Sequence, residues 1–329
     1  MTKPTIRSDL RSALMALLAF GLFASHDALV KILGSQYSIF QIIFFSGLFA
    51  FVPVTLMMTA DKAADNFRPH RPWLLAARMT TGVISMACAF YAFTRLALAE
   101  TYALLFATPL LITVLAVPLL GEVVRLRRWI AVLVGLAGVL VVLRPGAADL
   151  NLGHLAALTA ACGSALSAII IRKVGGAERP AVLILFPMFA NIGVMALLLP
   201  QVYQPVELAD LALMASVGLL AMLAQLSIIA AYRSAPAVVV APVQYSQILW
   251  ATLFGYLIFN DVPDKWVFIG AGIIILSGLF VVLRESTEDV SEKRPVLRTS
   301  NLRPDTGPSP RPKPVDRDNI TKADLQDKS

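Results

Sequence analysis

Three ionisable side chains stand close together near the start of the chain, inside a long apolar stretch. His26, Asp27 and Lys31 fall in the segment SHDALVK, and the twelve residues before it, ALMALLAFGLFA, carry no charge. An ionisable group at the depth of a membrane helix costs roughly 2.5–3.5 kcal/mol on insertion scales, so such a group is a functional hypothesis by default. Proton binding, or binding of the charged part of a solute, is the chemistry open to them.

Two interpretations of this segment stay open. Asp27 precedes Lys31 by four residues, the favourable order for an ion pair on one helix, so the two side chains could neutralise one another near an interface. Alternatively, Asp27 faces an aqueous cavity and binds a proton or a cationic part of a solute. His26 is expected to be a hydrogen-bonding packing residue.

Two further charges lie within or close to apolar stretches. Arg78 stands near the expected cytoplasmic end of its helix, where it could snorkel, pair structurally, or hold an anionic group. Glu100 is expected to pair with Arg95, five residues earlier. We therefore keep Arg78 as a candidate site residue.

Uncharged polar residues give a broader candidate set for a solute site. Ligand sites combine apolar walls with a few polar groups, although single amides also link membrane helices. Three of these residues follow Pro242, where a loosened helix could expose carbonyl groups to a cavity. The set is Tyr91, Tyr102, Asn191, Gln225, Gln244, Tyr245 and Gln247.

The composition indicates that these residues belong to a membrane protein. Hydrophobic residues make up 57% of the 329 and charged residues only 15%, with a mean hydropathy of +0.73. Soluble domains carry about 25% charged residues. The net charge of +7 comes from basic residues that punctuate apolar runs instead of forming one basic face, which argues against a nucleic-acid partner and for the lipid bilayer.

Ten stretches are apolar over about the 20 residues that a helix needs to cross a bilayer. With the N-terminus inside, the cytoplasmic segments hold 13 basic residues and the outer ones four. The positive-inside rule therefore predicts both termini in the cytoplasm of an inner-membrane protein, with an uncleaved first helix. The stretches are 12–32, 39–60, 73–94, 97–120, 127–144, 152–172, 181–200, 209–231, 236–259 and 265–284.

An internal repeat relates the two halves of the chain. YAFTRLALAE aligns with AYRSAPAVVV, LLGE (119–122) with IFND (258–261), and LVGLAGVLVVLR with IIILSGLFVVLR. Because each half has five predicted helices, an odd number, the second half begins on the opposite side of the membrane. The predicted fold is an all-α integral membrane protein of ten transmembrane helices, arranged as two inverted five-helix repeats typical of secondary transporters.

The predicted boundaries follow from this repeat. We expect a cytoplasmic N-terminus over 1–11, repeats over 12–144 and 152–284, and a disordered cytoplasmic tail over 285–329, which is rich in Pro, Ser, Asp and Lys. Four glycines, Gly135, Gly138, Gly272 and Gly278, permit close helix packing. That seam could lie within one monomer or between the two monomers of a homodimer.

The sequence resembles the EamA domains of the drug/metabolite transporter superfamily. The matching residues are FYAFTRLALAETYALLFATPLLITVLAVPLLGEVVRLRRWIAVLVGLAGVLVVLRPG (90–146), with a weaker copy at 231–284 in which IFND replaces LLGE. The resemblance implies ten helices, both termini inside, and solute transport through a central cavity. Similar proteins handle amino acids, nucleoside-like metabolites, S-adenosylmethionine or riboflavin, and we prefer uptake of a vitamin-like aromatic solute such as riboflavin over export or exchange.

Other classes of function lack their sequence motifs. The chain has no P-loop for ATP and no HExxH motif, and its three histidines are far apart in the sequence. Cys88 and Cys162 look like small packing residues. We expect no metal, no cofactor and no enzymatic activity; a channel or a membrane enzyme remains as an alternative to a small-molecule transporter with possible proton coupling.

Overall fold

The computed structural model describes residues 6–59, 69–121, 124, 126–145, 149–174, 178, 180–234 and 240–286, and this part of the chain is helical. Nearly all of the predicted tail lies outside the described residues. The elements are α1 (Ile6–Leu33), α2 (Ile39–Thr59), α3 (Pro72–Arg95), α4 (Leu98–Leu105), α5 (Thr108–Leu120), α6 (Leu126–Leu143), α7 (Leu152–Val174), α8 (Pro180–Val202), α9 (Leu208–Ser234), the 3-10 helix η2 (Ala241–Ser246), α11 (Gln247–Phe259) and α12 (Lys265–Ser286).

Within the described residues, seven helical stretches are long and apolar enough to cross a membrane. Two further apolar helices, Ile39–Val52 and Lys265–Val281, are shorter. Each of these nine helical stretches coincides with a stretch predicted from the sequence. The tenth predicted stretch, 236–259, is divided between η2 and α11. The seven are Ser12–Leu33, Pro72–Arg95, Leu98–Leu120, Leu126–Leu143, Leu152–Val174, Val182–Val202 and Leu208–Tyr232.

Two of the predicted stretches are broken next to a proline. The stretch 97–120 consists of α4 and α5, and Pro109 stands in the first turn of α5. In the second break, Pro242 stands in the first turn of η2, which passes into α11 at Gln247. Proline has no N–H to donate, so the α-helical hydrogen-bond ladder is interrupted at both places. The loosened helix expected after Pro242 is therefore a 3-10 segment.

The helices of the two halves pack in an exchanged pattern. α1 packs along α9 and α3 along α7, while α6 packs against α12 and α2 against α8. In the repeat, α1 corresponds to α7, α2 to α8, α3 to α9 and α6 to α12. Replacing each helix by its counterpart therefore turns the α1–α9 contact into the α7–α3 contact, and leaves the α6–α12 and α2–α8 contacts unchanged. The packing thus has a two-fold pattern, and the two halves are interleaved instead of forming two separate bundles.

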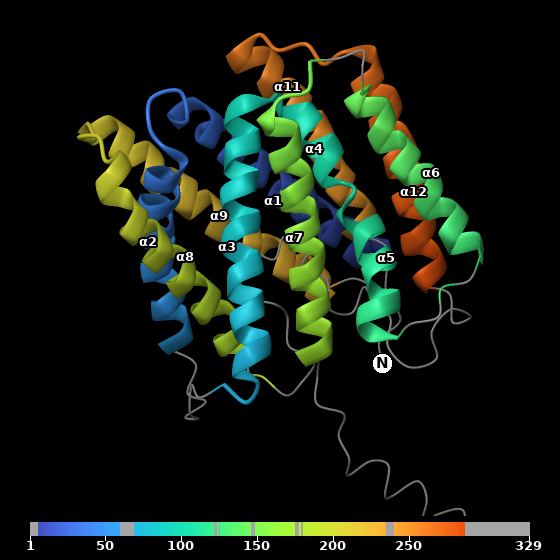
Figure 1. Cartoon of the computed structure of the whole chain (residues 1–329), viewed down its shortest axis with the longest axis horizontal. Helices are drawn as coiled ribbons and strands as arrows, with labels where there is room; N and C mark the ends of the chain where they lie inside the picture. The colour runs from blue at the N-terminus through green and yellow to red at the C-terminus, as the bar shows by residue number, and fades with distance from the viewer. Residues whose placement is uncertain are drawn as a thin grey trace, which may run out of the picture.

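The second half also runs in the opposite direction. In Figure 1, α3 rises from Pro72 to Arg95, and α7 beside it descends from Leu152 to Val174. α1 rises like α3, so α7 opposes α1, the helix that holds the same place in the first half. α2 and α8 lie on one side of the bundle and α6 and α12 on the other (Figure 1).

Glycines bring α6 and α12 into backbone contact. A Cβ atom placed on Gly270 would lie 2.7 Å from the carbonyl oxygen of Gly138, and one on Gly138 would lie 3.0 Å from the carbonyl oxygen of Gly270. Gly135 faces Leu110 and Ser277 at similar distances. This packing seam therefore exists within one chain. The sequence prediction was wrong for Gly272, since a Cβ there would meet nothing within 4 Å, and Gly270 takes its place.

The third residues of the aligned segments LLGE and IFND have the same backbone conformation. Gly121, the C-cap residue of α5, has φ 70° and ψ 25°, and Asn260, the C-cap residue of α11, has φ 54° and ψ 27°. Glycine and asparagine are the residues that adopt the left-handed region at a helix C-terminus at least cost. The substitution of Asn for Gly therefore preserves the turn.

Candidate functional site

Asp27 lies at the centre of a buried hydrogen-bond network. His26 Nδ1 is 2.8 Å from Asp27 Oδ1, and the hydroxyl of Tyr102, on α4, donates a hydrogen bond to Asp27 Oδ2. Asp27 is 0% exposed, His26 3% and Tyr102 1%. A buried carboxylate is tolerated only where hydrogen bonds replace its hydration, and these two partners provide them. The structure thus brings two predicted site residues, Asp27 and Tyr102, into direct contact.

Aromatic rings surround this network. His26 meets Phe90 edge-on, with ring centroids 5.6 Å apart, and Tyr102 packs against Phe93 and Phe106 at 5.3 and 6.1 Å. Phe106 in turn meets Tyr245 of η2 at 5.1 Å. A continuous row of rings therefore leads from the α1–α4 contact to η2. The hydroxyl of Tyr245 lies against Gly278, where a Cβ atom would clash with it, so the glycine makes room for the phenol.

Lys31 pairs with Asp261 and not with Asp27, which excludes the ion pair on one helix, one of the two interpretations that the sequence left open. Its ammonium group lies 2.5 Å from Asp261 Oδ2, donates to the carbonyl of Leu96 at 3.0 Å, and lies 4.6 Å from the centre of the Phe259 ring. Lys31 therefore joins the end of α1 to the turn after α11, in the other half of the chain. No local pattern around Lys31 indicates this partner, which is 230 residues away.

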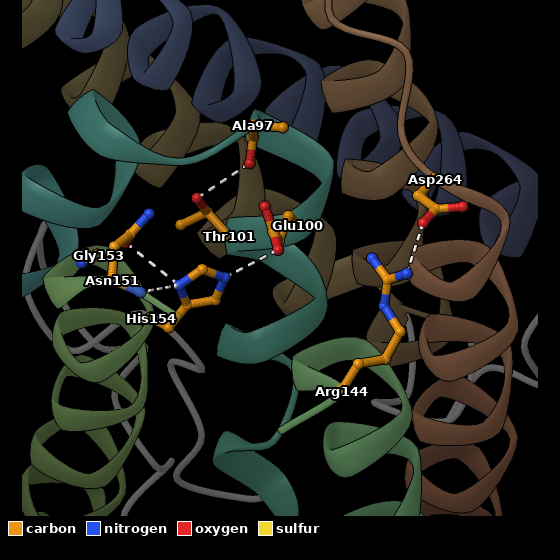
Figure 2. A network of polar contacts seen from close by, with 8 residues as sticks. All are labelled: Ala97, Glu100, Thr101, Arg144, Asn151, Gly153, His154 and Asp264. Atoms are coloured by element: carbon orange, nitrogen blue, oxygen red, sulfur yellow. Dashed lines mark hydrogen bonds and ion pairs between the residues drawn. The ribbon is translucent and has the colours of Figure 1, made fainter. Parts of the chain in front are cut away.

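Glu100 pairs with His154, not with Arg95 as predicted. His154 Nε2 lies 3.0 Å from Glu100 Oε1, while its Nδ1 accepts the backbone N–H of Asn151 at 3.1 Å. Figure 2 shows this network, in which Asn151 also caps α7 through the N–H of Gly153 at 2.8 Å. The contact ties α4 of the first half to α7 of the second. Arg95 instead lies over the ring of Tyr91, 5.4 Å from its centre.

α1, α3, α6, α8 and α11 all finish at the same end of the bundle, which we call the tied end. More polar contacts join helices there. Arg144 and Asp264 form an ion pair at 2.8 Å (Figure 2), beside the α6–α12 seam. Gln41 exchanges two hydrogen bonds with the backbone of Gln204 at 2.8 and 3.0 Å. The polar contacts of the tied end thus link the first half to the second in several places.

Tyr37 adds a contact to the tied end. Its hydroxyl donates to Asp210 at 2.7 Å. That hydrogen bond, together with burial, raises the pKa of the Tyr37 phenol above its ordinary value. The phenol therefore stays protonated, and so remains a donor, through and beyond the physiological pH range. This part of the tied end should weaken only as the pH rises through that raised pKa.

Arg78 is buried and structurally paired, one of the alternatives that the sequence left open. Nε and Nη2 donate to the carbonyl of Leu183 at 3.2 and 2.9 Å, and Nη1 donates to Ser167 at 3.0 Å. Leu183 stands four residues before Pro187, which has no N–H to bond this carbonyl. Arg78 therefore supplies the donor that the proline withholds and joins α3, α7 and α8.

The uncharged candidates differ in their surroundings. Asn191 donates to the carbonyl of Pro187 at 3.0 Å and so belongs with the α8 kink. Gln225 and Gln247 are fully buried, whereas Gln244 is half-buried on η2. The structure does not bring Tyr91 or Asn191 into contact with Asp27 through any described hydrogen bond, so the ten candidates do not form one cluster.

Several buried polar atoms lack a hydrogen-bond partner among the described residues. They include Nε2 of Gln225, Nε2 of Gln247, Nε1 of Trp250 and Oγ of Ser246. Leaving such a group unpaired costs about 1–3 kcal/mol, so each needs an explanation. The sequence pointed to the two glutamines but not to Trp250, because tryptophan is common in membrane helices and its donor gives no pattern.

A metal site finds no support in this part of the chain. Among the described residues, no group of three or more His, Cys, Asp or Glu side chains is placed to hold a metal ion.

The comparisons with known proteins agree on one family. The model of the EamA-like transporter family matches residues 10–144 and 151–283. An S-adenosylmethionine uptake transporter of Rickettsia bellii is 26% identical over 262 residues, which cover 80% of this chain and 90% of that protein. A riboflavin transporter of Vibrio cholerae is 31% identical over 192 residues, covering 58% of this chain and 64% of that protein.

Two more distant similarities complete the comparison. The pseudopaline exporter CntI of Pseudomonas aeruginosa is 24% identical over 266 residues, covering 80% of this chain and 93% of the exporter. A solved structure described only as "Crystal structure of protein" matches with a TM-score of 0.57 and 18% identity, covering 83% of this chain and 96% of that one. The latter supports the fold alone.

Proposed function

The chain belongs to the EamA-like transporter family, and on that premise we propose that it is a ten-span secondary active transporter of a small organic metabolite. The match covers both halves, and it makes the chain a multi-span membrane protein and a transporter, not an enzyme. The observation that carries the proposal is that these two matched halves interleave around the buried Asp27 network. An interleaved pair of halves can rock about a central site, as alternating access requires.

The proposal of ten spans adds three helices to the seven that satisfy length and hydropathy. α2 and α12 are apolar but shorter over their described parts. η2 and α11 together run from Ala241 to Phe259, about the length that an untilted helix needs to cross the hydrocarbon core. In this arrangement the repeats keep the boundaries proposed from the sequence, 12–144 and 152–284.

For the orientation we propose that the tied end faces outward and that both termini lie in the cytoplasm of an inner-membrane protein. The support is the charge asymmetry, 13 basic residues against four. Alkaline phosphatase and green fluorescent protein, fused at the connection after α11 and after Ser286, test it. Phosphatase activity after α11 and fluorescence after Ser286 are expected; the reverse result contradicts the orientation.

Asp27 is the proposed coupling residue. His26 Nδ1 and Asp27 Oδ1 are 2.8 Å apart, so one proton can reside on either group without movement of the heavy atoms. Tyr102 holds the second carboxylate oxygen, which fixes the carboxyl group in position. A proton site shared between two groups, buried where helices of both halves meet, suits a carrier that takes up a proton on one side and releases it on the other.

The Asp27→Asn variant tests this role. It keeps the shape and the hydrogen bond from Tyr102 but cannot release a proton, so flux driven by a pH gradient should stop in proteoliposomes while solute exchange continues. Asp264→Asn, which alters the ion pair with Arg144 at the tied end, is the matched control and should retain pH-driven flux. An unchanged pH dependence in Asp27→Asn refutes the coupling role.

The proposal also names a class of solute and a direction of transport. We favour uptake of a flat, vitamin-like metabolite because relatives named for S-adenosylmethionine uptake and riboflavin transport match here, and because aromatic rings border Asp27. Export is the second candidate, since the pseudopaline exporter also matches over 80% of the chain. Flux of riboflavin and of S-adenosylmethionine into and out of proteoliposomes separates these candidates.

Saturation of that flux decides the class of the protein. A carrier saturates with solute because each turnover needs a conformational change. Linear, unsaturated flux at high rates indicates a channel and contradicts the proposal. A chemically altered product indicates an enzyme and does the same.

A further inference from the structure

The ends of α1 and α3 pack against one another at the tied end. Gly34, directly after α1, approaches α3 so closely that a Cβ atom on it would lie 2.8 Å from the Cβ of Thr94. Lys31 donates a hydrogen bond to the carbonyl of Leu96, the residue that follows α3, at 3.0 Å. α1 and α3 therefore close this end of the bundle between them.

The opposite end of the bundle is not closed in the equivalent way. Since α1 corresponds to α7 and α3 to α9 in the repeat, the counterpart of the α1–α3 contact is a contact between α7 and α9. In the described part of the chain, α7 and α9 do not pack against one another to a comparable extent. Near that end Ile228 of α9 packs in an apolar cluster with α1, whereas Ile169 of α7 packs in a separate cluster with α5. The two ends are thus unequal, although the repeat makes them equivalent.

Lys31 holds the closed end together. Besides the Leu96 carbonyl, its ammonium group contacts Asp261 Oδ2 at 2.5 Å, in the turn after α11, and the lysine side chain is only 15% exposed. An ion pair sheltered from water resists separation more than one on the open surface does. Asp27 lies one turn before Lys31 on α1, about 6 Å deeper. Lys31 therefore stands between the proposed coupling residue and the tied end.

We propose that the ends of α1 and α3 form a gate with Lys31 as its latch, and that the ends of α7 and α9 form a counterpart gate, which closes when the tied end opens. The α1–α9 and α3–α7 pairs are the units that move, because each packs along its length. Rocking one pair against the other exchanges the two gates, since the repeat relates them. The inference rests on the proposed transport function and assigns its moving parts to named residues.

A disulfide across the gate gives the first test. In the full-length chain with Cys88→Ser and Cys162→Ser, the pair Gly34→Cys and Thr94→Cys places two thiols across the contact. Their Cβ atoms need only a small shift to reach the separation of about 3.5–4.5 Å in a disulfide. Oxidation should lower saturable solute flux in proteoliposomes more than about tenfold, because a carrier changes conformation in every turnover, and a reductant should restore the flux.

The matched control joins α3 to α7, the helices proposed to move together. A Cβ atom on Gly163 would lie 3.0 Å from the Cβ of Ser85, so Gly163→Cys with Ser85→Cys forms an equivalent crosslink, which should leave the flux unchanged. An equal loss of flux with both crosslinks overturns the division into two moving units. Flux that survives the first crosslink overturns the gate, and a first pair that fails to crosslink does the same, because the closed contact is then absent.

Labelling of a single buried cysteine tests the latch without any measurement of flux. Ala28 is 2% exposed and stands three residues before Lys31, so Ala28→Cys in the cysteine-free chain should react slowly with a water-soluble maleimide in detergent. Asp261→Asn keeps the shape of the side chain but removes its charge. It should raise the labelling rate roughly three- to tenfold, because the weakened latch leaves the gate open more often. Asp264→Asn, which alters the other ion pair at the tied end, should leave the rate unchanged.

A second reporter separates opening of the gate from general loosening of the fold. Ser277 is 5% exposed in the α6–α12 seam, and the labelling rate of Ser277→Cys should not change when Asp261→Asn is added. A rise at both reporters means that the Lys31–Asp261 pair only stabilises the fold, and it overturns the latch. No rise at Ala28→Cys overturns the latch as well.

Failure of the gate and failure of transport give different results. A chain that shows the selective rise at Ala28→Cys but carries no solute in proteoliposomes contradicts transport and leaves the gate intact. Saturable flux that continues through the Gly34–Thr94 disulfide contradicts the gate and leaves transport intact.

Discussion

Arg78 illustrates how one buried charge can support a kinked membrane helix. A proline inside α8 leaves the carbonyl of Leu183 without its usual donor, and in lipid such a group finds no water. The guanidinium group of Arg78 reaches that carbonyl with two nitrogens. The charge therefore serves the stability of the α3–α7–α8 packing, and the kink and the arginine should depend on each other.

This dependence predicts a coupling between two substitutions. Arg78→Leu should lower the free energy of unfolding by about 2–3 kcal/mol, because the Leu183 carbonyl loses its donors. Pro187→Ala restores a backbone N–H in α8, so it should recover about 1 kcal/mol in the Arg78→Leu background. Denaturation of the single and double variants in detergent micelles measures the coupling.

Pro118→Ala is the control for that experiment. Pro118 also lies inside a helix, α5, but no described contact joins it to Arg78. Its effect should add to that of Arg78→Leu within about 0.3–0.5 kcal/mol. If the effect of Pro187→Ala on the free energy of unfolding is also additive with that of Arg78→Leu, the proposed link between the kink and the arginine is contradicted.

At single residues, the sequence indicated which polar side chains lie buried among the helices better than it indicated their partners. Asp27, Tyr102 and Arg78 were all identified, because a charged or polar residue in an apolar stretch is conspicuous. Their partners came from long range: Lys31 meets Asp261, and Glu100 meets His154. The expected local pairs failed because a helix end in a bundle has closer neighbours on other helices than on its own.

Among the helices, α6 and α12 form a close backbone approach between the two halves. Gly138 and Gly270 face one another across it. The ion pair between Arg144 and Asp264 closes the seam at the tied end. Since the seam joins the last helix of each half, side chains larger than glycine there should separate these helices.

Two alanine substitutions two residues apart test the seam. In Gly270→Ala the new Cβ would lie 2.5 Å from Val142 and 2.7 Å from the Gly138 carbonyl, so the free energy of unfolding should fall by about 1–3 kcal/mol. Gly272→Ala has open space around its Cβ and should be neutral or stabilising by up to about 1 kcal/mol. Chemical denaturation in micelles compares them, and equal effects contradict the seam.

Helix positions were predictable from the sequence, while their interruptions and contact faces were less so. Apolar length alone located the stretches that became α1 to α9, and Pro242 correctly indicated the loosened segment at η2. The break between α4 and α5 was not predicted, although Pro109 marks it. Which glycine of a helix faces its neighbour depends on rotation about the helix axis, and the apolar sequence of α12 gives no strong signal for that rotation.

At the scale of the whole molecule, the repeat was the most informative feature of the sequence. The departure of IFND from LLGE suggested unequal halves, yet the aligned residues Gly121 and Asn260 share a left-handed conformation. Alignment could not reveal that the halves exchange partners, with α1 against α9 and α3 against α7. That arrangement depends on which faces are complementary in three dimensions, and no pattern within one helix specifies it.

The exchanged packing has a consequence for biogenesis. Until α9 emerges from the ribosome, α1 lacks its main neighbour. The first half of the chain therefore stands in the bilayer without its final contacts during translation. A gene cut between codons 144 and 151 should therefore yield two fragments that are each degraded when produced singly but accumulate when co-expressed. Immunoblots of membranes from such strains measure this, and a lone fragment as abundant as the uncut polypeptide contradicts it.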